Sequence, residues 1–255
     1  MKVYKSRNPN KLRLGALFVL QVIFGVLPAV LFILFAIDNM RLADEAPEAV
    51  AAVPNFIFAY VSAAAIVLCG IAYFILGRRY NVILSGLRGE RSLEKIARRH
   101  RGEYDIFINC PVHFKKSRSE IDMILLGKNG LIIIEAKNHS GTVSGSDTDD
   151  TWTQYKHYKD GRSTEAEMKN PLKQLTRQRD ILKGILHAQG VDVWVDGVVY
   201  FSNPSIRLKL ALKNKASVVC AGEKELDDFI SSYRSPRPVK KEDLAKIKEI
   251  LAGMM

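Results

Sequence analysis

The chain opens with two long apolar stretches and then changes to short alternating patterns. Residues 14–37 and residues 54–77 contain no charged side chain. A helix rises about 1.5 Å per residue, so each stretch is long enough to cross a hydrocarbon core about 30 Å thick. The apolar region of a cleaved signal peptide is shorter than residues 14–37, and a second stretch follows here. The pattern therefore predicts two transmembrane helices.

The pattern after residue 77 is typical of a domain that mixes helices and strands. Its polar part, residues 138–169, is rich in Gly, Ser and Asp and predicts a long loop anchored by Trp152 and Tyr155. The order of elements predicts an α/β domain with a mixed sheet flanked by helices. The expected helices are 83–99, 170–190, 223–232 and 240–252, and the expected strands are 104–109, 119–126, 131–137, 195–201 and 216–220.

Charged residues around the apolar stretches predict the orientation in the membrane. Basic residues precede the first stretch and crowd the segment Arg78–Arg101, whereas the segment 38–53 carries four acids and only Arg41. Basic segments stay on the cytoplasmic side. The expected parts are a cytoplasmic segment 1–13, transmembrane helices 14–37 and 54–77, an external loop 38–53, and a cytoplasmic domain 78–255 with a core at about 86–220. Both termini are expected in the cytoplasm of a multi-pass protein of the inner (plasma) membrane.

The net charge and the cysteines narrow the class of protein only slightly. The chain carries 38 Lys and Arg against 27 Asp and Glu. Anionic lipid head groups near Arg78–Arg101 and nucleic acid are both candidate partners for this excess. Cys69, Cys110 and Cys220 show no paired spacing, which argues against a zinc site or a disulfide framework.

A candidate site lies in the stretch SEIDMILLGKNGLIIIEAKN, residues 119–138. Two apolar strands joined by a turn end in Asp122, Glu135 and Lys137. If Lys128 pairs with Leu131, Asp122 faces Lys137; if Gly127 pairs with Gly130, Asp122 faces Glu135. Because side chains alternate along a strand, either register puts the three charges on one face, and only an odd register or a bulge would separate them.

Two explanations of this cluster stay open at the level of the residues. Neighbouring carboxylates repel unless a cation lies between them, and oxygen ligands suit Mg²⁺ or Mn²⁺. With a lysine beside them, they suit metal-assisted hydrolysis of a phosphodiester. The simpler alternative is a cross-strand salt bridge between Asp122 and Lys137. Glu90, on the helix 83–99, is similarly open: it either faces the same site or pairs with Arg91 and Arg98 in solvent.

An ordered set of motifs resembles a known family. The motifs are Gly89-Glu90, Glu120-Ile121-Asp122, the run Gly130–Asn138 with Gly141, Trp152, Asn170-Pro171 with Gln174, and the strand Val198–Asn203. Together they resemble the nuclease-related domain (NERD), a branch of the PD-(D/E)XK nuclease-like superfamily. The family often has Gln where this chain has Glu120. The resemblance implies a restriction-endonuclease-like α/β fold, here preceded by a transmembrane helical hairpin.

The resemblance also implies roles for single residues. Asp122 and Glu135 would bind Mg²⁺ or Mn²⁺, helped by the carbonyl of Ala136. Lys137 would position the attacking water, Glu90 would be an accessory acid, and Gln174 would close the site. The expected protein is a membrane-anchored, metal-dependent nuclease acting on DNA or RNA at the cytoplasmic side, with residues 14–37 and 54–77 in the lipid bilayer. The alternative is a non-catalytic nucleic-acid-binding or scaffold protein that keeps the fold.

Overall fold

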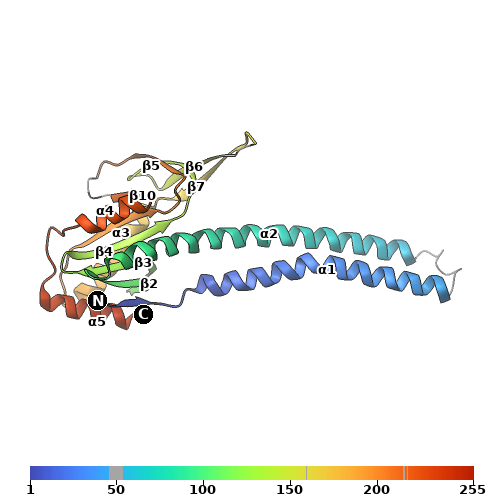
Figure 1. The fold of residues 1–255 in the computed structure, drawn as a ribbon, viewed down its shortest axis with the longest axis horizontal. Helices are drawn as coiled ribbons and strands as arrows, with labels where there is room; N and C mark the ends of the chain where they lie inside the picture. The colour runs from blue at the N-terminus through green and yellow to red at the C-terminus, as the bar shows by residue number, and fades with distance from the viewer. Residues whose placement is uncertain (46–53, 159, 215, 217) are drawn as a thin grey trace. The chain divides into compact units, whose positions relative to one another are not determined.

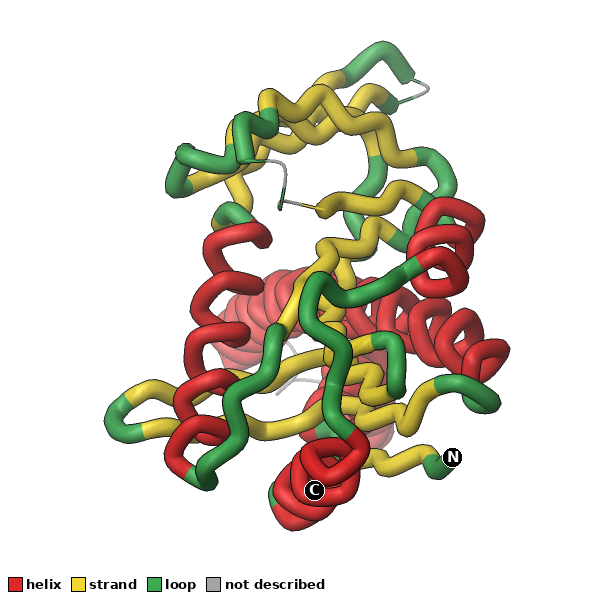
Figure 2. Tube along the Cα trace, turned by 90° about the vertical axis from the view of Figure 1, so that its left-hand side faces the viewer, coloured by secondary structure: helices red, strands yellow, loops and turns green. Residues whose placement is uncertain are grey.

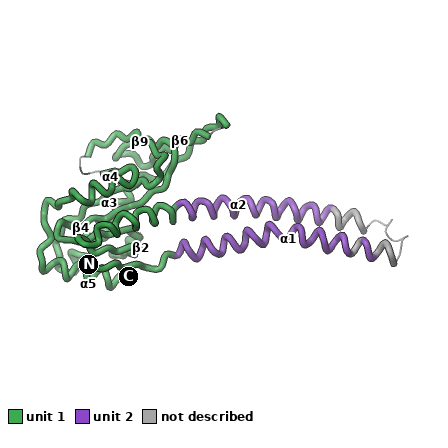
Figure 3. Tube along the Cα trace, in the orientation of Figure 1, with its two compact units in different colours: residues 1–8, 86–255 green, residues 9–85 purple. Residues whose placement is uncertain are grey.

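The chain forms two compact units. The computed structural model describes residues 1–45, 54–158, 160–214, 216 and 218–255 (Figure 1). One unit comprises residues 9–85, and the other combines residues 1–8 with residues 86–255 (Figure 3). The first eight residues therefore belong to the C-terminal unit, although residues 9–85 separate them from it in the sequence.

The unit of residues 9–85 contains one long helix and most of a second, whose last residues belong to the other unit. Helix α1 spans Pro9–Glu45 and α2 spans Pro54–Ala97. Two helical segments, Pro9–Ile37 in α1 and Tyr60–His100, which runs from α2 into the 3-10 helix that follows it, are long and apolar enough to cross a membrane, with mean hydropathies of 2.8 and 2.1. The predicted separate helix 83–99 is instead the end of α2 and its 3-10 continuation, because no proline interrupts residues 78–97. Residues 38–45 of the predicted loop are helical, and residues 46–53 lie outside the described residues.

A mixed sheet of six strands forms the centre of the other unit. The strands lie in the order β1-β2-β3-β4-β8-β10. The pairs β2–β3 and β3–β4 are antiparallel. The pairs β1–β2, β4–β8 and β8–β10 are parallel. The strand bounds are β1 Val3–Lys5, β2 Tyr104–Phe114, β3 Ser117–Gly127, β4 Gly130–Lys137, β8 Val195–Phe201 and β10 Val218–Ala221. The α/β class with a mixed sheet is confirmed, and β1 is a strand that the sequence pattern did not predict.

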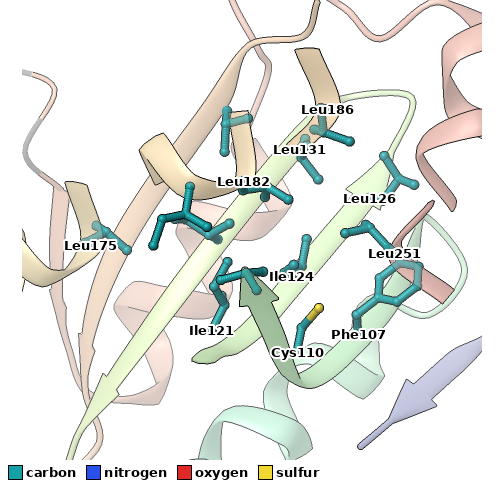
Figure 4. Close-up of a cluster of buried hydrophobic side chains, with 14 of the residues drawn as sticks. Phe107, Cys110, Ile121, Ile124, Leu126, Leu131, Leu175, Leu182, Leu186 and Leu251 are labelled. Carbon is teal, nitrogen blue, oxygen red and sulfur yellow. The ribbon is translucent and has the colours of Figure 1, made fainter. Parts of the chain in front are cut away.

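Helices cover both faces of this sheet (Figure 2). On one face, α3 (Pro171–Ala188) and α5 (Lys241–Gly253) pack against Ile124, Leu126 and Leu131 (Figure 4). On the other face, the end of α2, which continues into a short 3-10 helix at Arg98–His100, and α4 (Glu223–Ser232) cover Met123, Leu125 and Ile132. The alternation of apolar side chains along each strand explains these two cores.

A second sheet of four strands replaces the predicted loop. Its order is β7-β6-β5-β9, with β5 at Gly141–Ser146, β6 at Thr151–His157, β7 at Ser163–Lys169 and β9 at Ile206–Ala211. Trp152 is fully buried, as predicted, but Tyr155 is 37% exposed, so its predicted anchoring role is wrong. These strands were missed because polar residues dominate them and only tertiary pairing with β9 completes the sheet.

Asn170 connects this second sheet to the start of α3. Its Oδ1 accepts a hydrogen bond from the Leu172 N–H at 2.9 Å, as an N-cap residue does. Its Nδ2 donates to the carbonyl oxygens of Ser146 and Asp149 at 3.1 and 2.7 Å. Pro171 then occupies the first helical turn, where a missing N–H has no cost. The hydrogen bonds of Asn170 therefore fix the beginning of α3, and the direction of its first side chains, relative to the second sheet.

Candidate active site

The hairpin of β3 and β4 adopts the second of the two expected registers. Gly127 pairs with Gly130 and Met123 pairs with Ile134. Gly130 has φ +143°, and a Cβ there would lie 2.7 Å from the Tyr233 ring. The turn therefore requires glycine, and this requirement helps to set the register.

On both β2 and β3, the alternation of side chains between the two faces of the sheet is interrupted, and the two interruptions lie opposite each other. On β2, Phe107 and Cys110 lie in the same core although they are three residues apart, and Asn109 between them has φ +55°. On β3, Ile121 and Ile124 likewise share that core. The side chains of both strands therefore change phase around Asn109 and Asp122, as they do at an irregularity of a sheet.

The Asp122 side chain contacts β4 just beyond the last residue pair of the β3–β4 ladder. Its Oδ2 accepts a hydrogen bond from the Ala136 N–H at 2.8 Å. The carboxylate thus binds the backbone of β4 just past the Met123–Ile134 pair. Asp122, Glu135 and Lys137 remain close together despite the irregularity, because this bond holds Asp122 against the end of β4.

Glu135 is a buried carboxylate held by one ammonium and two amides. It is only 3% exposed. Lys137 Nζ donates to its Oε1 at 2.6 Å, and Gln174 Nε2 donates to the same oxygen at 2.7 Å. Gln178 Nε2 donates to Oε2 at 2.7 Å. Charge-assisted hydrogen bonds of this kind offset the desolvation of a buried carboxylate.

The Lys137 ammonium bridges strand and helix. Besides Glu135, it donates to Gln174 Oε1 at 3.0 Å, so its position depends on the first turns of α3. Lys137 does not form the ion pair with Asp122 that the simpler explanation of the cluster required; its ion-pair partner is Glu135.

The pKa of Asp122 reflects its burial and its repulsion by the nearby Glu135 carboxylate. Burial raises the pKa of Asp122 well above its ordinary value, and the nearby Glu135 charge raises it further. The Ala136 N–H and the Lys137 ammonium lower the pKa, and Glu90 raises it. A cation placed beside Asp122 and Glu135 would relieve this repulsion.

Glu90 faces the site side of α2 and is half-buried. Its Oε2 accepts hydrogen bonds from Asn8 Nδ2 at 2.5 Å and from Asn109 Nδ2 at 3.2 Å. Arg98, proposed above as its solvent partner, pairs instead with Glu94 at 2.7 Å. Glu90 is therefore tied to the irregular part of β2 and acts electrostatically on Asp122.

A close approach of α2 to the strand ends makes this placement of Glu90 possible. A Cβ on Gly89 would lie 3.2 Å from both Asn138 Cβ and Ser202 Oγ. The Ser202 N–H in turn donates to the Lys137 carbonyl at 2.9 Å. The absence of a side chain at position 89 lets the helix pass over the ends of β4 and β8.

Three polar residues of the site were missed by the sequence analysis. Gln178 is fully buried, and its Nε2 also donates to the Glu120 carbonyl at 2.8 Å. It lies four residues after Gln174, so the spacing of one helical face could have found it. Asn8 and Asn109 carry no such signal, because long-range pairing of β1 and the left-handed backbone at Asn109 bring them to Glu90.

The donor set fits a hard divalent cation. Within the described residues, no group of three or more His, Cys, Asp or Glu side chains forms a ready metal cluster. The candidate oxygen donors are two mutually repelling carboxylates, Asp122 and Glu135, and the main-chain carbonyl of Ala136. Such oxygen donors suit Mg²⁺ or Mn²⁺, which keep several waters and bind through one or two carboxylates.

Comparison with known proteins gave a family match over the segment that contains Glu90, Asp122, Glu135, Lys137 and Gln174. Residues 85–202 match the family described as the nuclease-related domain, NERD. Neither the search of curated proteins nor the search of solved structures found a match. The acid–acid–lysine cluster lies inside the matched segment, which is similar in sequence to the nuclease-related domain.

Proposed function

We propose that the protein is a membrane-anchored, metal-dependent nuclease that hydrolyses phosphodiester bonds of DNA or RNA on the cytoplasmic side. The observation that carries this proposal is the arrangement of Asp122, in the middle of β3, beside Glu135 and Lys137 at the end of β4, inside a segment that matches the nuclease-related domain.

The two carboxylates and the Ala136 carbonyl are the proposed ligands of Mg²⁺ or Mn²⁺. A bound divalent cation supplies Lewis-acid stabilisation of the charge that develops on the phosphate and lowers the pKa of water. Glu135 is supported for this task by Gln178, which fixes Oε2 from α3. Asp122 is supported by the Ala136 N–H.

Lys137 orients the attacking water and stabilises charge on the phosphate in this proposal. Its ammonium is already held at a defined position by Glu135 Oε1 and Gln174 Oε1. A positioned cation of this type contributes more to a transition state than a mobile one, because little reorganisation is needed. Gln174 is therefore a positioning residue, and Glu90 is a proposed accessory acid that raises the proton affinity of Asp122.

The test is cleavage by the full-length chain in detergent with Mg²⁺ or Mn²⁺, on single- and double-stranded DNA and RNA. The full chain is required, since β1 and Asn8 precede the first long helix and belong to the nuclease-related unit. Cleavage should need the metal and stop with EDTA. Asp122→Asn, Glu135→Gln and Lys137→Met should each lower the rate by roughly 10²–10⁴-fold.

Lys128→Met is the matched control for Lys137→Met. Lys128 is exposed in the turn of the same hairpin, at the far end of β4 from the site. It should cleave at the parent rate. Cleavage at the parent rate by both Asp122→Asn and Lys137→Met would remove the proposed site. Metal-dependent stabilisation and nucleic-acid binding without cleavage would support the non-catalytic alternative instead.

The membrane part of the proposal rests on the two apolar helical segments Pro9–Ile37 and Tyr60–His100. Basic residues on either side of them support a topology with both termini in the cytoplasm and the helices in the inner (plasma) membrane. A reporter fused after Met255 should behave as cytoplasmic, and one inserted in the acidic segment 38–53 as external. The opposite pattern would invert the topology and move the nuclease-related unit outside.

A further inference from the structure

A cavity lies between α1 and α2, where the first apolar stretch begins and the second ends. Its volume is about 530 Å³. The five apolar residues lining it and the three arginines at its margin all belong to the unit of residues 9–85. The apolar lining is Ala16, Leu17, Leu20, Val82 and Ile83, and the arginines are Arg13, Arg78 and Arg79.

The charge around this cavity has one sign. No Asp or Glu occurs in residues 9–37 or in residues 54–89. Arg13, Arg78 and Arg79 form no ion pair with any residue in the part of the chain that the structure describes. Arg78 lies over the Phe74 ring at 5.9 Å, a contact that leaves its charge uncompensated. Three arginines therefore line an apolar cavity without a carboxylate that pairs with them in the described part of the chain.

The position of these arginines along the chain matches the boundary of a bilayer. Arg13 directly precedes the first uncharged stretch, and Arg78 and Arg79 directly follow the second. If these stretches cross the membrane, the three side chains meet at the head-group level of the cytoplasmic leaflet. An occupant of the cavity there needs an anionic group beside an apolar one.

We infer that this cavity binds one anionic phospholipid, with its phosphate on the three arginines and the first part of an acyl chain against Ala16, Leu20 and Val82. Guanidinium pairs well with phosphate because of its planar, multiple donors. The cavity size falls in the range of small-molecule sites. The inference rests on the membrane location in the proposed function, but not on nuclease activity.

The test titrates phosphatidylglycerol into the full-length protein in a neutral detergent, with binding followed by native mass spectrometry. Phosphatidylcholine with the same acyl chains is the neutral probe, and glycerol 3-phosphate is the head group without a lipid tail. Phosphatidylglycerol should bind saturably with one molecule per chain and at least tenfold more tightly than either probe. Each arginine at an anionic head group contributes about a factor of five in affinity.

Two triple variants separate the cavity from general basic charge. Arg13→Gln/Arg78→Gln/Arg79→Gln should weaken phosphatidylglycerol binding by roughly 10- to 100-fold. Lys11→Gln/Arg88→Gln/Arg91→Gln removes the same charge from exposed positions that do not line the cavity, and should change affinity less than about threefold.

The outcomes distinguish this inference from the membrane proposal. Equal weakening by both triple variants, or equal binding of the two phospholipids, would overturn the specific site. Tight binding of glycerol 3-phosphate would assign the arginines to a soluble anion instead. Release of the parent chain from membranes by alkaline carbonate would contradict the membrane anchor itself, whereas retention without a preference for phosphatidylglycerol would contradict only the lipid site.

Discussion

Lys137→Met removes the only cation that hydrogen-bonds the buried Glu135 carboxylate within the described residues. The parent carboxylate is 3% exposed and accepts from Lys137 at 2.6 Å and from Gln174 and Gln178 at 2.7 Å each. Methionine keeps most of the side-chain volume, so packing changes little. The variant leaves a buried negative charge with two neutral amide donors.

The expected cost follows from these contacts. Breaking a buried pair by removing one partner costs about 3–5 kcal/mol, and the two amides reduce this to about 2–4 kcal/mol. For a unit of this size, 1 kcal/mol shifts Tm by roughly 2–4 °C, so a fall of about 5–15 °C is expected. Glu135→Gln/Lys137→Met removes both charges and should be more stable than Lys137→Met alone.

Tryptophan fluorescence is a suitable assay, because both tryptophans, Trp152 and Trp194, lie in the unit that contains the site. Melting is recorded on the full chain without divalent metal, with Lys128→Met as the control. Mg²⁺ should recover part of the lost stability of Lys137→Met, since it supplies a cation to the same carboxylates. A Tm within about 1 °C of the parent, together with additive single and double variants, would refute the argument that Lys137 compensates buried charge.

Three further predictions follow from other contacts. Because the pKa of Asp122 is raised, the folded chain holds this proton over a pH range in which the unfolded chain has lost it, so stability should fall as pH rises from about 4 through the raised pKa. Asp122→Asn should abolish this part of the fall in melting curves recorded without metal. If the stabilities of the parent and the variant depend on pH in the same way, the direction of the pKa shift is wrong. Gly145→Ala places a Cβ 2.2 Å from Trp152 Cδ1 and should cost about 1–3 kcal/mol in melting experiments, whereas Gly86→Ala, with no atom within 4 Å, should be neutral or stabilising; equal effects would show that the Trp152 contact is not limiting. Asn8→Ala removes a 2.5 Å hydrogen bond to Glu90 and should lower the cleavage rate roughly tenfold at saturating metal, and an unchanged rate would separate Glu90 from the chemistry.

Local patterns indicated the acids of the candidate site and many of the helices and strands. Val195–Phe201 and Glu223–Ser232 occupy the predicted bounds, because each combines a regular apolar period with a clear boundary. The turn residues also indicated two registers for the hairpin, and the structure adopts the one that pairs Gly127 with Gly130. The roles of Asp122, Glu135 and Lys137 stay predictions until cleavage and metal binding are measured.

Tertiary pairing decided what has no local period. The second sheet forms from polar strands that are stabilised by neighbours far along the chain, such as β9 beside β5. The pairing of Val3–Lys5 with β2 brings Asn8 into contact with Glu90, which lies 82 positions away in the sequence. No pattern within either segment predicts this contact. The phase change at Asn109 and Asp122 likewise depends on two strands at once. The sequence by itself therefore determined which residues form the candidate site and where the chain is apolar enough to cross a membrane. The three-dimensional packing decided which side chains hold those residues in place, because that requires contacts between distant segments.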